Sequence, residues 1–204
     1  MKEEEGYIKF NCIWTKEEFV FPVTIYNSLT HWRQKLYNLQ LIGMYENNVG
    51  YGNISIRDKD QNFIITGSKT GGKEKLDRKD YALVTHFRID QNEITCRGFT
   101  KASSEAMSHA ALYSSSDEIG AVIHVHHRFL WDKLYGKVPT TDNMATFGTP
   151  EMAEELMRIC KSADWKNRKI IVMGGHQEGL ITFGKDIDEA GEILLEHYYK
   201  YSSL

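Results

Sequence analysis

Two histidines at alternate positions of an apolar run are the most informative chemical feature of this sequence. The run Ala121-Val122-Ile123-His124-Val125-His126-His127 has the composition of a buried strand. Side chains at positions i and i+2 of a strand point to the same face, so His124 and His126 can bind one ion, whereas His127 points to the opposite face. Imidazole nitrogen is a preferred ligand of zinc. A half-buried strand with two structural histidines is the alternative interpretation.

A glycine-rich segment, residues 173–179, offers a third ligand. Glycines let the backbone approach a site closely, and a strand end can point His176 inward. Glu178 lies on the same face and competes with His176 for this role. A catalytic zinc site needs about three protein ligands and one open position. The alternative is a plain glycine-rich turn with exposed polar residues.

Ser103, Ser104 and Glu105 begin a predicted helix over residues 103–115. Serine caps helix N-termini, and the helix dipole favours a glutamate in the first turn. His109 follows Glu105 by one helical turn, which makes Glu105 the best candidate for a general base. Two hydroxyls at a helix N-terminus also form an anion site, for which phosphate is the natural ligand. An ordinary capped helix start is the alternative.

Two glycine-containing loops, residues 50–55 and 66–73, can complete such an anion site. Glycine allows backbone N–H groups to converge on an oxygen-rich ligand, and the second loop adds hydroxyls and lysines. The second loop does not have the spacing of a Walker A motif. A nucleoside triphosphate is therefore not indicated.

The elements that position these residues follow from hydrophobic periodicity and turn signals. Apolar residues spaced by three and four predict a helix over residues 24–44. Three strand pairs are predicted, at 53–57 with 62–66 around the turn Asp58-Lys59-Asp60, at 81–88 with 93–97, and at 169–174 with 180–184. Residues 120–126 add a further strand, and two more helices begin near Thr149-Pro150 and Asp186. The sequence predicts an α/β domain with a largely antiparallel sheet of at least five strands.

Composition limits the class of protein. The chain has 204 residues, of which 41% are hydrophobic and 26% charged, as in one globular domain. The formal charge of -3 lacks the basic excess that nucleic-acid binding requires. Three scattered cysteines without a CxxC motif favour reduced thiols and a cytoplasmic location. The acidic residues 1–5 are not followed by an apolar segment, and no apolar run is long enough for a membrane span, so we expect no membrane partner.

The order of these motifs resembles that of the class II aldolase/adducin family, over roughly residues 28–200. The motifs are Gly52-Asn53-Ile54-Ser55-Ile56-Arg57, Ile65-Thr66-Gly67-Ser68, Ser103-Ser104-Glu105, His124-Val125-His126, Ala145-Thr146-Phe147-Gly148-Thr149-Pro150-Glu151 and the late His176. The resemblance implies a three-layer fold with a largely antiparallel central sheet flanked by helices. We expect residues 1–27 to form an N-terminal extension packed on a domain of residues 28–204.

The resemblance also implies roles for single residues. The family's H-x-H zinc ligands fall on His124 and His126, and its catalytic glutamate falls on Glu105. In the family the third zinc histidine is followed directly by glycine, whereas Gln177 and Glu178 intervene here, so we favour His176 and keep Glu178 as a rival. The phosphate contacts of the family fall on Asn53, Ser103 and Ser104, and on a threonine-glycine loop represented here by Ser68, or by Thr70 with Gly71.

The function implied is that of a lyase using zinc or another divalent transition metal, which cleaves a small sugar phosphate by a retro-aldol reaction through an enediolate. The resemblance also implies a homotetramer with sites between subunits. Dehydration or epimerisation of a ketose phosphate on the same scaffold is one alternative, and a non-catalytic interaction domain, as in adducin, is another. Retention of the three histidines and Glu105 argues against the latter. We expect the family's metal ligands to apply to this sequence better than its substrate-binding residues do. The reason is that the connection over residues 133–144 is short and the chain ends at Leu204 without the family's C-terminal tail.

Overall fold

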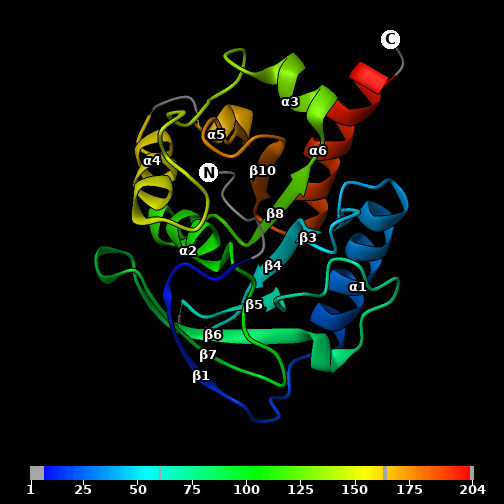
Figure 1. Cartoon of the computed structure of the whole chain (residues 1–204), viewed down its shortest axis with the longest axis vertical. Helices are drawn as coiled ribbons and strands as arrows, with labels where there is room; N and C mark the ends of the chain where they lie inside the picture. Colours follow the sequence, from blue (N-terminus) through cyan, green and yellow to red (C-terminus); the bar gives the residue numbers. More distant parts are fainter. Residues whose placement is uncertain (1–6, 60, 163–164, 203–204) are drawn as a thin grey trace.

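An eight-stranded sheet forms the centre of the structure, a computed structural model that describes residues 7–59, 61–162 and 165–202 (Figure 1). The acidic N-terminus at 1–5, Asp60 of the first predicted turn and residues 203–204 lie outside the described residues. The strands of this sheet are β1 (Asn11–Thr15), β4 (Asn53–Arg57), β5 (Phe63–Thr66), β6 (Tyr81–Arg88), β7 (Glu93–Arg97), β8 (Ala121–His126), β9 (Ile170–Val172) and β10 (Gly179–Gly184). A separate short hairpin pairs β2 (Gly43–Met44) with β3 (Gly50–Tyr51).

The strand order is β1-β7-β6-β5-β4-β8-β10-β9. Among the described strands of this sheet, β1 and β7 alone run parallel, and every other neighbouring pair is antiparallel. The predicted pairs β4–β5, β6–β7 and β9–β10 are all present. The expectation of an α/β fold with a largely antiparallel sheet is therefore confirmed.

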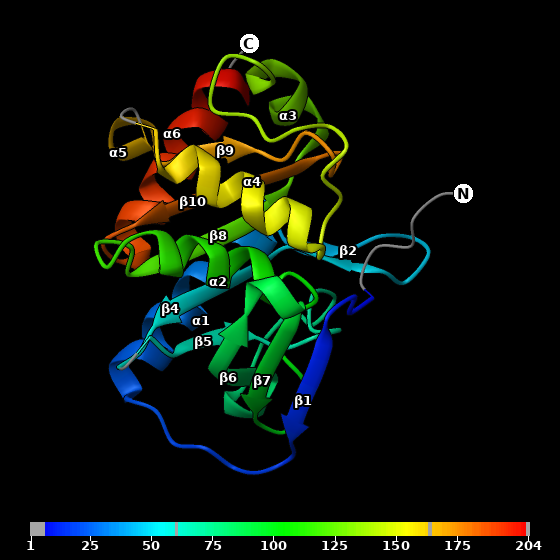
Figure 2. The ribbon, with the colours of Figure 1, turned by 90° about the vertical axis from the view of Figure 1, so that its left-hand side faces the viewer.

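Helices cover both faces of the sheet and make three layers. They are α1 (Val23–Asn38), α2 (Ala106–Ser115), α3 (Arg128–Leu134), α4 (Pro150–Cys160), α5 (Trp165–Arg168) and α6 (Ile187–Ser202). Helices α2 and α4 pack together on one face, while α1 and α6 pack together on the other (Figure 2). No described helix combines the length and the apolar character that a membrane span needs.

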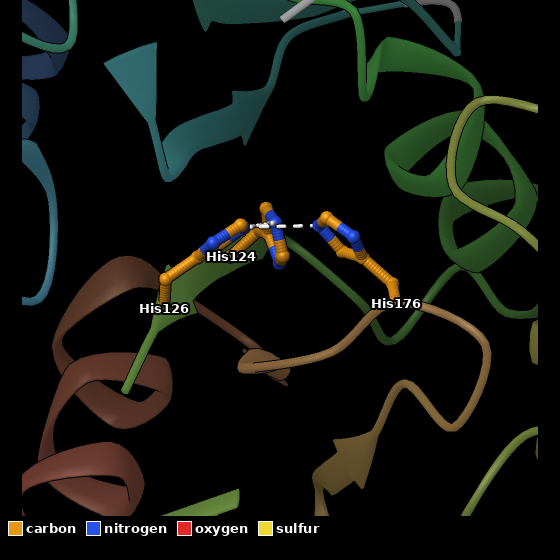
Figure 3. Close-up of side chains that lie close together, drawn as sticks. All are labelled: His124, His126 and His176. Atoms are coloured by element: carbon orange, nitrogen blue, oxygen red, sulfur yellow. Dashed lines mark hydrogen bonds between the residues drawn. The ribbon is translucent and has the colours of Figure 1, made fainter. Parts of the chain in front are cut away.

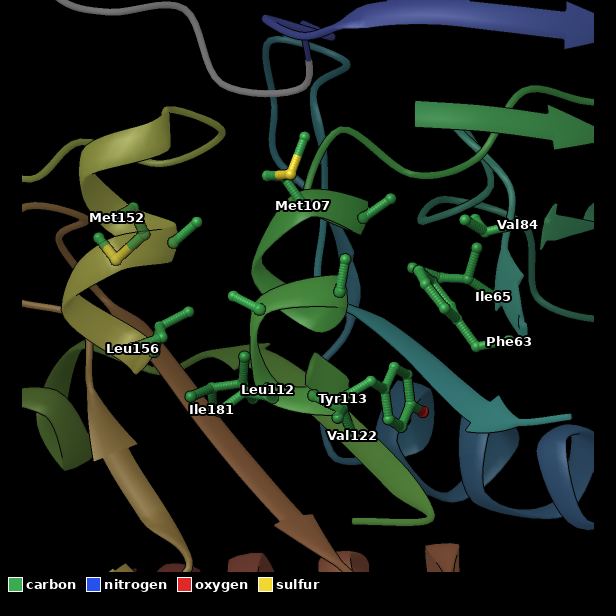
Figure 4. Packing of buried hydrophobic residues seen from close by; sticks show 14 of the residues in the cluster. Phe63, Ile65, Val84, Met107, Leu112, Tyr113, Val122, Met152, Leu156 and Ile181 are labelled. Atoms are coloured by element: carbon green, nitrogen blue, oxygen red, sulfur yellow. The ribbon is translucent and has the colours of Figure 1, made fainter. Parts of the chain in front are cut away.

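Alternation along the strands divides the core into two clusters. Phe63 and Ile65 of β5 face the α2 side, whereas Ile64 between them faces the α1 side. On β8, Val122 faces the α2 side and Ile123 the α1 side in the same way. Figure 4 shows Val122 among side chains of α2 and β10. Since side chains two residues apart share a face, His124 and His126 also lie on the α2 side.

The predicted end of the first helix is wrong. Helix α1 ends at Asn38, and Gln40 adopts a left-handed conformation with φ of 58°. The amides of Gln40 and Leu41 then bond to the carbonyls of Tyr37 and Leu36, which is the Schellman arrangement of a helix end. Leu39 and Ile42, which continue the apolar spacing of three and four residues, lie beyond the end of the helix, and Ile42 is buried there. Residues 43–51 form the β2–β3 hairpin instead of a last helical turn.

Candidate functional site

The end of β8 carries two of the predicted ligands at the middle of the sheet. His124 is paired with Asn53 of β4 on one side and with Ile181 of β10 on the other. His126 is paired with Gly179, the first residue of β10. Both histidine side chains are buried, with relative exposures of 1% and 5%. Strands β4 and β10 flank His124, while His126 is flanked by β10 and donates its amide to the Leu41 carbonyl at 3.0 Å, so backbone hydrogen bonds hold this end of β8 in place.

His176 reaches the same place from the turn between β9 and β10. Its amide bonds to the Met173 carbonyl at 3.1 Å, and its carbonyl accepts from the Gly179 amide at 2.9 Å. A Cβ atom on Gly179 would lie 2.5 Å from Cδ2 of the His176 ring, so this glycine leaves room for the imidazole. His176 is 4% exposed. The structure thus brings together the three histidines that the sequence singled out.

The three imidazoles form a compact group of nitrogens (Figure 3). Nε2 of His126 lies 3.0 Å from Nε2 of His124 and 3.0 Å from Nε2 of His176. Nδ1 of His124 lies 3.0 Å from the Leu180 carbonyl, which can only accept, so the proton of this ring is on Nδ1 and its Nε2 carries a lone pair. Burial lowers the pKa of His124 to about 4 and the pKa values of His126 and His176 well below the ordinary range. Neutral rings with converging nitrogens fit a divalent metal ion such as zinc.

Glu105 faces this group from the start of α2. Its Oε1 lies 3.6 Å from Nε2 of His176, and its Oε2 accepts a hydrogen bond from the Ser108 hydroxyl at 3.2 Å. The predicted placement in the first turn of the helix is corrected, because Glu105 occupies the N-cap position and its backbone N–H donates to the Ser103 hydroxyl at 3.3 Å. The cap position brings the carboxylate to the histidines. Glu105 can there move a proton or serve as a further ligand.

The residues predicted to contact phosphate line the same cleft, which has a volume of about 830 Å³. They are Asn53, Ser68, Thr70, Gly71, Ser103 and Ser104. Hydrogen bonds hold two of these segments together, because the Ser68 amide donates to the Lys101 carbonyl at 2.8 Å. Within the described part of the chain, Oδ1 of the buried Asn53 side chain has no hydrogen-bond partner, and this atom is available to a ligand. Lys69 and Lys101 add positive charge to the lining.

Arg33 is a supporting residue that the sequence reasoning missed. The residue is 2% exposed, and its guanidinium donates to the carbonyls of Glu74 at 2.8 Å, Thr70 at 3.1 Å and Gly71 at 2.8 Å. Burial lowers the pKa of Arg33. The three bonds hold the glycine loop from the side of α1. The signal was present, because Arg33 occupies a position of the apolar stripe formed by Leu29, Trp32 and Leu36.

Tyr45 is a second residue that was missed, because it follows the segment assigned to the helix. Its hydroxyl lies 2.8 Å from Nδ1 of His126 and donates to Oε2 of Glu178 at 2.8 Å. The Glu178 carboxylate is thus hydrogen-bonded to Tyr45. Among the described residues, the group that could hold a metal consists of the three histidines and does not include Glu178. The ring of Tyr51 stacks on that of His126, with centroids 5.4 Å apart.

Comparison with known proteins identifies a family for part of the chain. The family described as class II aldolase and adducin N-terminal domain matches residues 39–131. The predicted resemblance to the class II aldolase and adducin family is confirmed. No curated protein matches the sequence.

Solved structures share the class II aldolase fold at low sequence identity. An L-fuculose 1-phosphate aldolase is 21% identical, with a TM-score of 0.62 and coverage of 88% of this chain and 84% of that one. YgbL from Escherichia coli, described as a putative aldolase/epimerase/decarboxylase, is 16% identical with a TM-score of 0.62, covering 85% and 84%. L-fuculose-1-phosphate aldolase from Thermus thermophilus is 16% identical with a TM-score of 0.56, covering 90% and 98%. These likenesses show the fold.

The match to the class II aldolase and adducin domain contains most of the candidate site. It includes Asn53, the 66–73 loop, Glu105 and the two histidines of β8. It ends before His176, which completes the histidine group in the structure. The third nitrogen is therefore contributed by a part of the chain that the family match does not cover.

Proposed function

We propose that this protein is a metal-dependent lyase that cleaves a small sugar phosphate by a retro-aldol reaction. One observation carries the proposal: the three imidazole nitrogens and the Glu105 carboxylate face a cleft that also presents the Asn53 amide, serine hydroxyls and two lysines. Such a cleft offers a cation site and an anion site to one ligand. A sugar phosphate has the matching pair of groups, a carbonyl with neighbouring hydroxyls and a phosphate.

The three histidines would hold the metal, for which zinc is our proposal because three neutral imidazoles and an open position are typical of catalytic zinc sites. When bound, a divalent cation supplies positive charge beside the substrate oxygens on which negative charge develops as a carbon–carbon bond breaks. Other divalent first-row ions compete for the same ligands. The donor set excludes none of them.

Residues of the chain itself would bind and orient the substrate. Asn53, Ser103 and Ser104 would bind the phosphate, together with the loop that carries Ser68, or Thr70 and Gly71. Thr70 donates its own proton to the Gly67 carbonyl at 2.7 Å, so its hydroxyl oxygen would accept from a ligand and the loop amides would donate. Binding energy gained at this end orients the reacting atoms at the other end.

Glu105 would handle the proton that the reaction requires. As the carbon–carbon bond breaks, its electron pair would pass to the carbon beside the carbonyl. The hydroxyl group on the other carbon would lose its proton to Glu105 and become the carbonyl of the aldehyde product. The carbon beside the carbonyl must then gain a proton. Glu105 Oε1, which faces the histidines, would carry that proton, while the Ser108 hydroxyl holds Oε2 in place.

Glu105→Gln tests this role. The amide keeps the size of the side chain but cannot carry the proton, so we expect turnover to fall by about 100- to 10,000-fold while the metal content per chain is unchanged. Turnover is measured as aldehyde release from a panel of ketose 1-phosphates by zinc-loaded protein. Metal is measured by elemental analysis on washed protein.

Glu154→Gln is the matched control, because this carboxylate is exposed on α4 and does not line the cleft. It should leave both turnover and metal content unchanged. Unchanged turnover in Glu105→Gln would contradict the assignment of Glu105. Conversion of the panel without aldehyde release would favour the dehydratase or epimerase alternative. Failure of the wild-type protein to bind zinc would favour the non-catalytic alternative.

We also propose that the protein is a cytoplasmic homotetramer with its sites between subunits, and that residues 1–27 and 28–204 are an extension and a domain. The family resemblance supports the assembly. Cys12, Cys96 and Cys160 are not joined by disulfides, which supports a reducing compartment. Strand β1 of the extension pairs with β7, which supports an extension packed on the domain.

A further inference from the structure

The Tyr45 hydroxyl lies between a carboxylate and a ring nitrogen of the histidine group. It is 2.8 Å from Oε2 of Glu178 and 2.8 Å from Nδ1 of His126. A hydroxyl has one proton to donate, and a carboxylate can only accept. The Tyr45 proton is therefore directed to Glu178.

This assignment determines where the proton of His126 lies. Because Tyr45 donates to Glu178, its oxygen can only accept from His126, so Nδ1 of His126 carries the ring proton. Nε2 of a neutral His126 then carries a lone pair. His124 is held in the same tautomer by the Leu180 carbonyl. Two lone pairs thus face each other across 3.0 Å, an arrangement that a cation between them relieves.

The hairpin that carries Tyr45 holds the residue in place. The Tyr45 amide donates to the Val49 carbonyl at 2.9 Å, and its carbonyl accepts from the Asn48 amide at 2.9 Å. The ring of Tyr45 lies against that of Tyr51, with centroids 4.5 Å apart, and Tyr51 in turn stacks on His126. The backbone bonds hold the main chain of Tyr45, and the ring packing orients the Tyr45 ring and the imidazole of His126.

We propose that Tyr45 and Glu178 are positioning residues that hold His126 in the tautomer whose Nε2 binds a metal ion. The inference rests on the proposed function in one respect, namely that the histidine group takes a divalent cation. Glu178 acts through Tyr45 and is not itself a ligand. Partners of this kind raise metal affinity because they fix both the proton and the orientation of the ligating ring.

Cobalt(II) titration of metal-free protein, followed by visible absorption, measures the effect on affinity. Tyr45→Phe and Glu178→Met each remove a hydrogen bond from the series Glu178–Tyr45–His126, so we expect cobalt to bind about 10- to 100-fold more weakly. Glu178→Gln keeps an oxygen that can accept from Tyr45 and should fall between Glu178→Met and the wild type. This order distinguishes positioning from a loss of folding, which thermal unfolding monitors in every variant.

Tyr135→Phe and Glu154→Gln are the matched controls, because both side chains are exposed and neither lines the cleft. They should bind cobalt as the wild type does. Equal affinity of Tyr45→Phe, Glu178→Met and the wild type would overturn the positioning role.

A measurement without metal separates this inference from the proposed function. Long-range nitrogen–proton NMR of the metal-free protein reports which ring nitrogen of His126 carries the proton. We expect Nδ1–H in the wild type and a mixture of tautomers in Tyr45→Phe. An Nε2–H tautomer in the wild type would overturn the inference even if cobalt binds. Absence of cobalt binding by a wild type with Nδ1–H would overturn the proposed metal site, while the tautomer that Tyr45 and Glu178 impose on His126 would stand.

Discussion

Arg33→Lys should weaken both the fold and the anion end of the cleft. The guanidinium uses two nitrogens to satisfy three carbonyls, whereas one ammonium on a thinner side chain cannot match this fork. At least one buried carbonyl loses its partner, and the remaining bonds lengthen. With about 1–3 kcal/mol for each unsatisfied buried group, the expected loss in unfolding free energy is about 2–4 kcal/mol. For a chain of 204 residues this corresponds to a fall in Tm of about 4–16 °C.

Urea unfolding measures the loss in free energy, and calorimetric titration with inorganic phosphate measures the effect on anion binding. Phosphate affinity should fall, because the loop that lines the cleft loses its support from α1. Arg158→Lys is the matched control, since Arg158 is an exposed partner of Glu155 and such pairs contribute at most about 1 kcal/mol. If Arg33→Lys is as stable as Arg158→Lys, the bonds to the loop carbonyls do not hold the loop, and the reasoning is refuted.

Two further outcomes are expected. In Gly175→Ala the new Cβ would lie 2.0 Å from the Ala145 carbonyl oxygen, so the turn must move and carry His176 with it. The affinity for cobalt should therefore fall at least about tenfold. Unchanged affinity would show that the turn adapts without moving His176. Light scattering at micromolar concentration should give the mass of a tetramer, while the mass of a monomer would count against sites shared between subunits.

Local patterns were sufficient to predict most of the sheet. The alternation of β8, which sends Val122 and Ile123 to opposite faces, requires only the geometry of a strand, and the turn residues placed the β4–β5 and β6–β7 pairs. The end of α1 was not predictable from apolar spacing, because Leu39 and Ile42 keep the helical spacing after the helix has ended, and Ile42 is buried there as a helical position would be.

The sequence was sufficient to predict which residues form the candidate site, but not how their side chains are arranged. The spacing of His124 and His126 indicated a shared face, whereas the choice between His176 and Glu178 depends on a turn whose shape is set by packing against residues 141–145. The error at the end of α1 also concealed Tyr45, so the link from Glu178 to His126 could not be seen. Backbone conformation in short loops, and contacts between distant segments, are the information that a single sequence lacks.

The parallel pairing of β1 with β7 has a consequence for the synthesis of the chain. Asn11 is paired with Glu93, a residue 82 positions later. At a synthesis rate of about 5–20 residues per second, β1 leaves the ribosome about 4–16 s before β7 does. During that time its backbone N–H and C=O groups cannot form the hydrogen bonds that they make with β7 in the folded protein. Strand β1 is therefore unpaired when it is first made, and it becomes part of the sheet only after β7 has been synthesised.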